Sequence, residues 1–399
     1  MIHLKLFETE SQYSAYTESD MLKPNVSHVV EDDKNYFNSK RTYLTFEIIG
    51  DGDIKWETRD ASFTRTIEYK KNDGEWTEII STTSGTNISV VAGDLVQFRG
   101  KNKAYGIPGA SNCSFYGTTA RFNVYGNIMS LVKRWGFYKM KTVGPNAFKY
   151  LFEKCTGLTS AENLVLPATT LATYCYNGMF QNCKNLTSAP ELPATALAGG
   201  CYGYMFRGCT SLTSAPELPA TALASNCYYN MFQGCTSLTT APSILPAETL
   251  ADGCYGYMFC GCTKLTSAPE LPATTLASSC YYNMFQGCTS LTTAPELPAV
   301  RLAIFCYSYM FMGCTSLTSA PELPATTLTE SCYNSMFYGC TNLNYIKCLA
   351  TNISARESHI SWVYGVASSG TFVKAAGITE ATWGRGNNGI PTNWTVQNA

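Results

Sequence analysis

The chain has 399 residues, more than one ordinary domain needs and enough to bury a large core. Its 28 Lys and Arg balance 29 Asp and Glu, which excludes the basic field typical of a nucleic-acid-binding protein. Charged residues make up only 14% of the chain and aromatic residues 13%, so the surface must rely on Tyr, Ser, Thr and Asn, as contact surfaces do.

Residues 1–40 are expected to form a separate N-terminal anchoring unit. Its phrase "MLKPNVSHVVEDDKNYFN" indicates two extended pieces about an acidic turn. Glu8 and Glu10 interrupt any apolar run, so we expect neither a signal peptide nor membrane insertion. The phrase resembles the openings of virion proteins from phages and prophages of Bacteroides. That resemblance implies attachment to other virion or surface-assembly proteins through residues 1–40.

Residues 41–132 have the pattern of a β-sandwich domain. Short alternating stretches such as "TYLTFEII", "DIKWETR" and "NISVVAGDLVQFRG" are separated by turn signals, notably Asn72-Asp73-Gly74. Six or seven such strands predict an all-β sandwich resembling immunoglobulin or fibronectin-type modules. Such a module carries a sugar site or serves as a spacer, and the spacer is the commoner role.

A repeat of 26 residues, once 27, fills the predicted solenoid domain over residues 133–348. Each copy opens on Cys-Tyr and closes on a second Cys eight residues later. The opening cysteines are Cys175, Cys201, Cys227, Cys254, Cys280, Cys306 and Cys332, and the closing ones are Cys183, Cys209, Cys235, Cys262, Cys288, Cys314 and Cys340. A degenerate copy that ends at Cys155 precedes them, which makes about eight. This period, with Leu at fixed offsets, predicts a leucine-rich-repeat solenoid.

Within one copy we expect an extended segment, a turn and a short helix. "LTSAP" ends at Pro216, because proline cannot donate to a strand ladder. "CYYNMFQGC" would place Cys227, Met231, Phe232 and Cys235 on one face of a helix. The expected fold class is therefore mixed α/β, with the repeats stacked on one another because a single copy cannot cover its own apolar face.

The repeated cysteines are expected to be buried small hydrophobic residues. Along a helix the two thiols of one copy would stand roughly 12 Å apart, too far for a disulfide. Their spacing also differs from structural zinc sites, and we expect no metal. Disulfides between neighbouring copies are the alternative. Cys113, Cys260 and Cys348 fall outside the two columns and are candidates for free thiols.

The phrase "MFxGCTSLTSAP" resembles the BspA-like leucine-rich repeats of bacterial surface proteins, common in gut Bacteroides. The resemblance implies a right-handed solenoid that serves adhesion or recognition and performs no chemistry. The present repeat differs in having Met where Ala is usual, at Met179, Met205 and Met231, and in its paired prolines.

Residues 349–399 are expected to form a C-terminal cap. The last copy of a solenoid exposes an apolar face, which Trp362, Trp383 and Trp394 would cover. The alternative is that these three rings form a platform for sugars.

Tyrosines that follow the first Cys of each copy are the predicted ligand surface. Tyr supplies large and rigid contacts at low entropic cost. The ten candidates are Tyr202, Tyr204, Tyr228, Tyr229, Tyr255, Tyr257, Tyr281, Tyr282, Tyr307 and Tyr309. A purely structural stack along the convex side is the alternative.

Sequence motifs of catalysis are lacking. Histidine occurs only at His3, His28 and His359, and we expect none beside a plausible Ser or Cys nucleophile in the sequence, which leaves proximity in space open. Neither G-x-S-x-G nor a P-loop appears, so we expect a non-enzymatic protein without a cofactor. A glycan-processing enzyme, the competing class, would need two carboxyl groups about 5–9.5 Å apart.

The function expected from these features is recognition or adhesion. The first hypothesis is a phage or prophage virion component, a tail fibre or receptor-binding protein that contacts a bacterial cell surface and is located in the virion. The alternative is a BspA-like adhesin, at the bacterial surface or secreted, that binds host protein or glycan. The expected partner is a cell-surface glycan or protein, not nucleic acid, and a homo-oligomer is possible.

Overall fold

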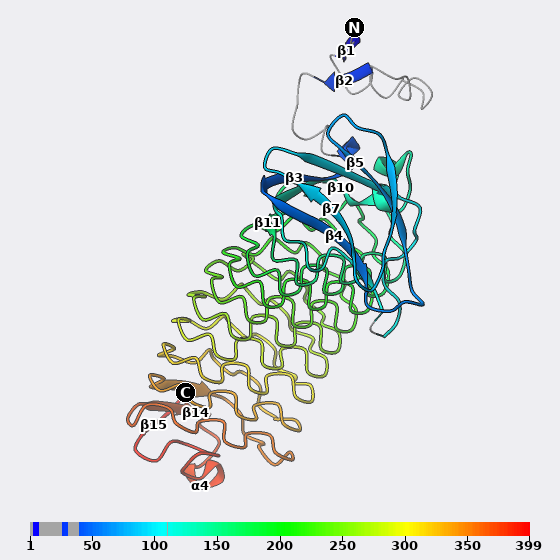
Figure 1. The fold of residues 1–399 in the computed structure, drawn as a ribbon. Helices are drawn as coiled ribbons and strands as arrows, with labels where there is room; N and C mark the ends of the chain where they lie inside the picture. Colours follow the sequence, from blue (N-terminus) through cyan, green and yellow to red (C-terminus); the bar gives the residue numbers. More distant parts are fainter. Residues whose placement is uncertain (1–2, 8–25, 31–39, 110) are drawn as a thin grey trace.

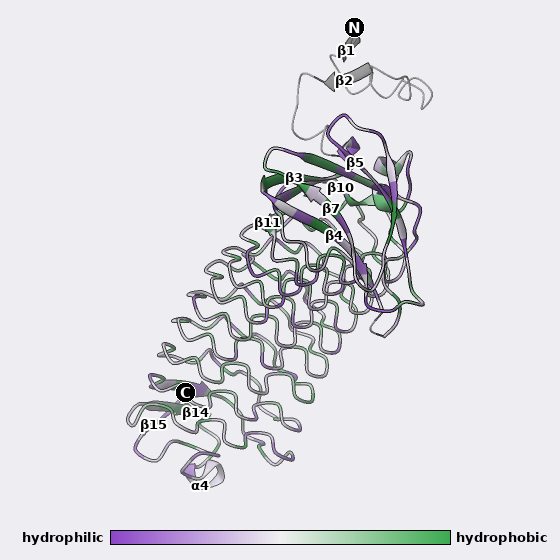
Figure 2. Cartoon of the chain, in the orientation of Figure 1, coloured by the Kyte–Doolittle hydropathy of each residue, from purple (hydrophilic) through white to green (hydrophobic). Residues whose placement is uncertain are grey.

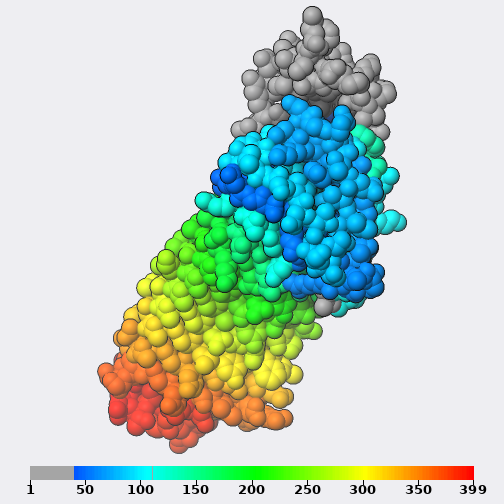
Figure 3. Space-filling view, in the orientation of Figure 1, coloured from blue at the N-terminus to red at the C-terminus, as the bar shows by residue number. Residues whose placement is uncertain are grey.

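The computed structural model describes residues 3–7, 26–30, 40–109 and 111–399. The molecule is elongated, with β-sheets at one end of a long solenoid and the C-terminal segment at the other (Figure 1). The space-filling view shows sheets and solenoid as one continuous body (Figure 3). The acidic turn predicted near the N-terminus lies outside the described residues. Strands β1 (His3–Phe7) and β2 (Val26–Val30) pair in parallel.

Two sheets lie between residues 44 and 127, and Phe46 of one and Trp56 of the other both contact Phe115. Their strands are β3 Leu44–Gly50, β4 Gly52–Thr58, β5 Thr66–Lys71, β6 Thr77–Ile80, β7 Thr86–Val90, β8 Leu95–Gly100, β9 Cys113–Ser114 and β10 Arg121–Asn127. One sheet has the order β10-β3-β8-β5-β6 and the other β7-β4-β9. Apolar residues stand out on β3, whereas most of β4 and the outer loops are hydrophilic (Figure 2). The likeness to immunoglobulin domains stays a prediction.

The larger sheet continues into the solenoid. Strand β10 pairs in parallel with β11 (Leu158–Ser160) and β12 (Leu164–Val165). Two 3-10 helices, η2 (Ile128–Leu131) and η3 (Phe137–Lys139), link the two parts. Since β10 supplies hydrogen bonds to the start of the solenoid, the sheets cover the end that would otherwise be an open edge.

The helix predicted in each repeat is wrong. In residues 141–344, all of which the structure describes, the chain forms no helix. Every fourth residue of the Cys-to-Cys segment has a left-handed backbone instead, as at Asn226 (φ 56°), Asn230 (φ 58°) and Gly234 (φ 73°). An α-helix needs consecutive right-handed residues, so each of these positions interrupts it. The segment is a series of tight turns, and one such repeat is called a rung below.

Backbone hydrogen bonds alternate along these turns. The amides of Met231 and Cys235 donate within their own rung, to the carbonyls three residues earlier, at 3.1 and 3.0 Å. The amide of Phe232, between them, donates to the Met258 carbonyl of the next rung at 2.9 Å. Every second backbone donor of the segment is therefore satisfied only when the next rung is in place, so the rungs stabilise one another.

The opposite side of each rung is extended, as "LTSAP" predicts. Neighbouring rungs meet there through single parallel bridges, such as Ser214 with Thr240. Because these contacts are one residue long, the stack depends mainly on the turns and on the side chains between them.

Two columns of stacked aromatic rings fill the core. One is Tyr176, Tyr202, Tyr228, Tyr255, Tyr281, Tyr307 and Tyr333, with centroids 5.7–6.2 Å apart. The other is Phe152, Phe180, Phe206, Phe232, Phe259, Phe285, Phe311 and Phe337, with centroids 5.4–5.7 Å apart. The Phe column starts against Phe115 of the sheet core, and both columns end on Trp362.

The C-terminal segment closes the other end. Strands β13 (Tyr345–Cys348), β14 (Thr371–Lys374) and β15 (Thr395–Asn398) form a parallel sheet, and α4 spans Glu380–Trp383. Trp362 stacks on Trp383 with centroids 5.3 Å apart. Both rings and Trp394 are buried, so they cover the last rung and offer no platform for sugars.

We expect Phe232→Ala to destabilise the protein by about 3–5 kcal/mol, because it removes a fully buried ring from the middle of its column. Urea unfolding of the full chain measures this change. The matched control is Val300→Thr, since Val300 is 62% exposed and Thr274 and Thr326 occupy the same place in other rungs. A loss below about 1 kcal/mol for Phe232→Ala would show that this ring is not in the core.

Candidate functional site

Half of the ten predicted ligand-binding tyrosines lie in the core. Tyr202, Tyr228, Tyr255, Tyr281 and Tyr307 are at most 2% exposed and form the Tyr column. Burial raises the pKa of each phenol above its ordinary value. A contact surface requires accessible side chains, so the prediction is wrong for these five.

The other five tyrosines form a half-exposed row on the outside of the turns. The outer tyrosine row consists of Tyr204, Tyr229, Tyr257, Tyr282 and Tyr309. Successive rings meet edge to face, with centroids 5.4–5.8 Å apart. This geometry is favourable for aromatic pairs. A ligand-binding role for these five rings stays a prediction.

Two versions of the repeat alternate along this row. "CYGYMF" places its second Tyr one position later than "CYYNMF" does. Where one rung has a ring, its neighbour has Gly, Ser or Asn at the same position. A Cβ on Gly256 would lie 2.9 Å from the Tyr229 ring, so the ring covers bare backbone of the next rung. The alternation lets bulky rings occupy successive rungs without collision.

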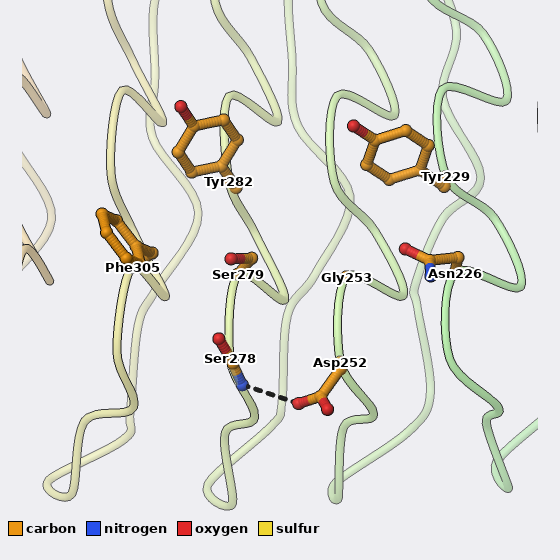
Figure 4. Close-up of a pocket in the computed structure, with 8 residues that line it drawn as sticks. All are labelled: Asn226, Tyr229, Asp252, Gly253, Ser278, Ser279, Tyr282 and Phe305. Atoms are coloured by element: carbon orange, nitrogen blue, oxygen red, sulfur yellow. Dashed lines mark hydrogen bonds between the residues drawn. The ribbon is translucent and has the colours of Figure 1, made fainter.

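A shallow groove runs beside the row, across four rungs (Figure 4). Its volume is about 520 Å³. The residues of this groove, called the Phe305 groove, are Asn226, Tyr229, Asp252, Gly253, Ser278, Ser279, Tyr282 and Phe305. Figure 4 shows the Tyr229 and Tyr282 rings on one side of the line from Asn226 to Phe305, with Asp252 and Ser278 on the other.

Asp252 is the one charged residue that lines the Phe305 groove. Its Oδ1 accepts a hydrogen bond from the Ser278 amide at 3.0 Å, which fixes the carboxylate across the gap between two rungs. Since no Lys or Arg lines the groove, its local charge is negative. Sequence reasoning selected the two tyrosines but missed Asp252 and Phe305, which stand just before the first Cys of their rungs.

A second depression, of about 470 Å³, lies over the next turn and includes Gln233 and Cys260. Cys260 is half-buried, and its sulfur lies 3.9 Å from Gln233 Nε2 and 3.7 Å from Gln286 Oε1. Burial raises the pKa of the Cys260 thiol.

All 18 cysteines of the chain are free, and all except Cys260 are buried. The alternative of disulfides between rungs is therefore wrong. The closing thiols have a role that the sequence did not reveal, because each donates to the carbonyl of the Phe in the preceding rung. For Cys235 the acceptor is Phe206, with sulfur and oxygen 3.1 Å apart. Serine would make the same contact, but Cys buries more favourably.

One histidine does contact a serine, contrary to expectation. The Ser358 hydroxyl lies 2.7 Å from His359 Nδ1 and donates to the Ile353 carbonyl. Ser358 is buried, and the His359 ring meets Trp383 edge-on in the C-terminal segment. A nucleophile must reach its substrate, so this pair supports the cap and not catalysis. Burial lowers the pKa of His359.

The described residues form neither a metal centre nor a membrane-spanning helix. No three His, Cys, Asp or Glu side chains there converge on a point that could hold a metal ion. Nor does any helix in the same residues have the length and apolar character needed to span a bilayer.

The stacked rungs of about 26 residues define a leucine-rich-repeat solenoid. The family described as "BspA type Leucine rich repeat region (6 copies)" matches residues 139–244, 201–295 and 245–359. These matches together run from 139 to 359, more than half of the sequence, so the chain belongs to the BspA-type leucine-rich repeat family. The count of eight repeats stays a prediction.

Two solved structures are similar to the chain. A leucine-rich repeat protein from Bacteroides ovatus ATCC 8483 is 19% identical, with a TM-score of 0.29, over 65% of this chain and 78% of that one. A leucine rich cell surface protein from Faecalibacterium prausnitzii A2-165 is 15% identical, with a TM-score of 0.21, over 64% and 86%. Scores this low carry no argument about function. No curated protein matches the chain.

We expect one thiol to react quickly in the native protein and all 18 to react after unfolding without a reductant. The thiolate is the reactive form. Burial raises the pKa of Cys235 and Cys340 to about 12 and shields them, whereas Cys260 is only half-buried. Because the pKa of Cys260 is also raised, its labelling should accelerate as the pH increases.

A colorimetric thiol reagent measures the number of reactive thiols in the native protein and in the unfolded protein. The control variant Cys260→Gln carries the residue found at this place in Gln233 and Gln286, and it should lose only the fast phase. Fewer than 18 thiols after unfolding would reveal disulfides.

Proposed function

We propose that this protein is a non-enzymatic recognition or adhesion protein that binds a glycan or protein on a cell surface through the outer side of its turns. Its own location would be the bacterial surface or the extracellular space. Membership of the BspA-type family supports a recognition role, since leucine-rich-repeat solenoids present extended surfaces to partners. The virion role expected from residues 1–40 finds no support in the fold or in the comparisons.

The observation that carries the proposal is where the rungs differ from one another. Core positions repeat almost unchanged, whereas the position before each first Cys varies in size and polarity. Its occupants are Tyr174, Gly200, Asn226, Gly253, Ser279, Phe305 and Ser331. Stacking alone would be satisfied by one small residue in every rung, so the variation points to a surface shaped for a partner.

Two of these residues are unfavourable for the stability of the folded protein. Tyr174 is 45% exposed and Phe305 36% exposed, and both have a left-handed backbone, with φ of 55° and 56°. Exposed aromatic rings gain little from burial, and bulky residues are disfavoured in this conformation. A feature that opposes stability twice is better explained by contact with a partner than by folding.

The geometry argues against the competing enzyme hypothesis. Glycoside hydrolysis uses a pair of carboxyl groups on either side of the bond that breaks. The Phe305 groove has a single carboxylate, Asp252. An arrangement of rings, one carboxylate and amide or hydroxyl groups suits binding.

We expect the labelled full chain to bind saturably to cell surfaces, and a double variant, Tyr229→Asn with Tyr282→Asn, to bind at least tenfold more weakly. Asn177 and Asn334 stand at the same position in other rungs, so the variant should fold. Flow cytometry against gut bacteria and epithelial cells measures binding.

The matched control for that experiment is Glu296→Ser, in an exposed column outside the groove where Ser243 is the occupant of another rung. It should bind as the parent protein does. Absence of saturable binding to any cell surface would refute the proposed function.

A further inference from the structure

We infer that the Phe305 groove binds a neutral sugar ring of a cell-surface glycan. The inference rests on the proposed function and specifies its site and its ligand class.

Small residues lie between large ones and leave the groove open to a sugar. Gly253 and Ser279 form the line between Asn226 and Phe305 (Figure 4). A Cβ on Gly253 would collide with Asn226 Oδ1 of the preceding rung, so the glycine lets the Asn226 amide lie over the backbone beside the groove. Ligand sites of this kind are concave and keep a few fixed polar groups. The volume of about 520 Å³ accommodates a sugar ring with its neighbours in a chain.

Phe305 and Tyr282 supply the apolar contacts. Their centroids lie 6.4 Å apart and their planes cross at 78°. One ring can therefore lie under a sugar while the other stands against its edge. The face of a pyranose ring carries C–H groups, and these pack on the electron-rich face of an aromatic ring. The cost of holding Phe305 exposed in a left-handed conformation is then offset when the ligand covers it.

The polar groups suit hydroxyls. Asp252 Oδ1 is held by the Ser278 amide, and Oδ2 has no hydrogen-bond partner among the described residues. A carboxylate oxygen accepts two hydrogen bonds, so Oδ2 can receive hydroxyl hydrogens from adjacent carbons of a sugar. Asn226 and Ser279 can each donate and accept, as mixed contacts with hydroxyls require.

Charge selects among glycans. The groove has a fixed negative charge at Asp252 and no lining cation. A sialic acid or uronic acid would place a second carboxylate beside it, which is unfavourable. We therefore expect neutral glycans to bind better than their acidic counterparts. An organic cation would satisfy the charge but leave Asn226 and the serines without partners.

The experiment is an array of neutral oligosaccharides and their sialylated counterparts, probed with the full chain, followed by titration of the best neutral binder. Two variants use residues that the protein's own rungs carry at this position. Phe305→Ser removes the ring, and Gly253→Asn adds a side chain that displaces the Asn226 amide, in a backbone conformation that Asn226 itself adopts. Each should raise the dissociation constant at least tenfold. Glu296→Ser, which changes an exposed side chain outside the groove, should leave the dissociation constant unchanged.

Several results would overturn the inference. They are a preference for sialylated glycans, binding of tetramethylammonium without binding of any sugar, and parent-like affinity in both groove variants. Binding to cells without any neutral glycan on the array would also overturn it while leaving the proposed function intact. If the protein bound neither to cells nor to the glycan array, the proposed function itself would be refuted.

Discussion

The structure depends on one backbone constraint, a left-handed residue at every fourth position of the Cys-to-Cys segment. That spacing divides the backbone donors into two sets, one used within a rung and one donated to the next rung. Neither set is sufficient alone, so a single rung has unsatisfied donors and a stack does not. The same constraint aims Tyr228 and Phe232 inward, and Asn226 and Tyr229 toward the solvent.

Burial between rungs turns the stacked turns into one core. The Phe column runs from Phe115 in the N-terminal sheets to Trp362 in the C-terminal segment, and the Tyr column reaches the same Trp. The sheets and the buried tryptophans thus cap opposite ends of the solenoid, because each covers an apolar face that another rung would otherwise cover. With the interior regular and closed at both ends, variation is confined to outward positions such as Gly253 and Phe305.

Much of the architecture could be predicted from the sequence, and the failures have physical reasons. The period, the buried cysteines and the capping tryptophans follow from spacing and apolar pattern. The tight turns could not be predicted in the same way. Met231 and Cys235 stand four residues apart, a spacing that a helix also produces. Gly or Asn at 226, 230 and 234 was the missed signal. With a helix assumed, the inner and outer tyrosines could not be told apart, and the groove, which joins residues of four rungs, could not be seen.

The most direct test of this account is the free energy of unfolding of Gly234→Ala. Gly234 has a φ of 73°, and an added Cβ would meet nothing closer than 3.9 Å, so only the backbone conformation is at issue. In a stack of turns the substitution should destabilise the protein by about 1–2 kcal/mol, since alanine is disfavoured in the left-handed region. In a helix, replacement of glycine by alanine would instead stabilise it by about 0.5–1 kcal/mol. A measured gain in stability would contradict the account.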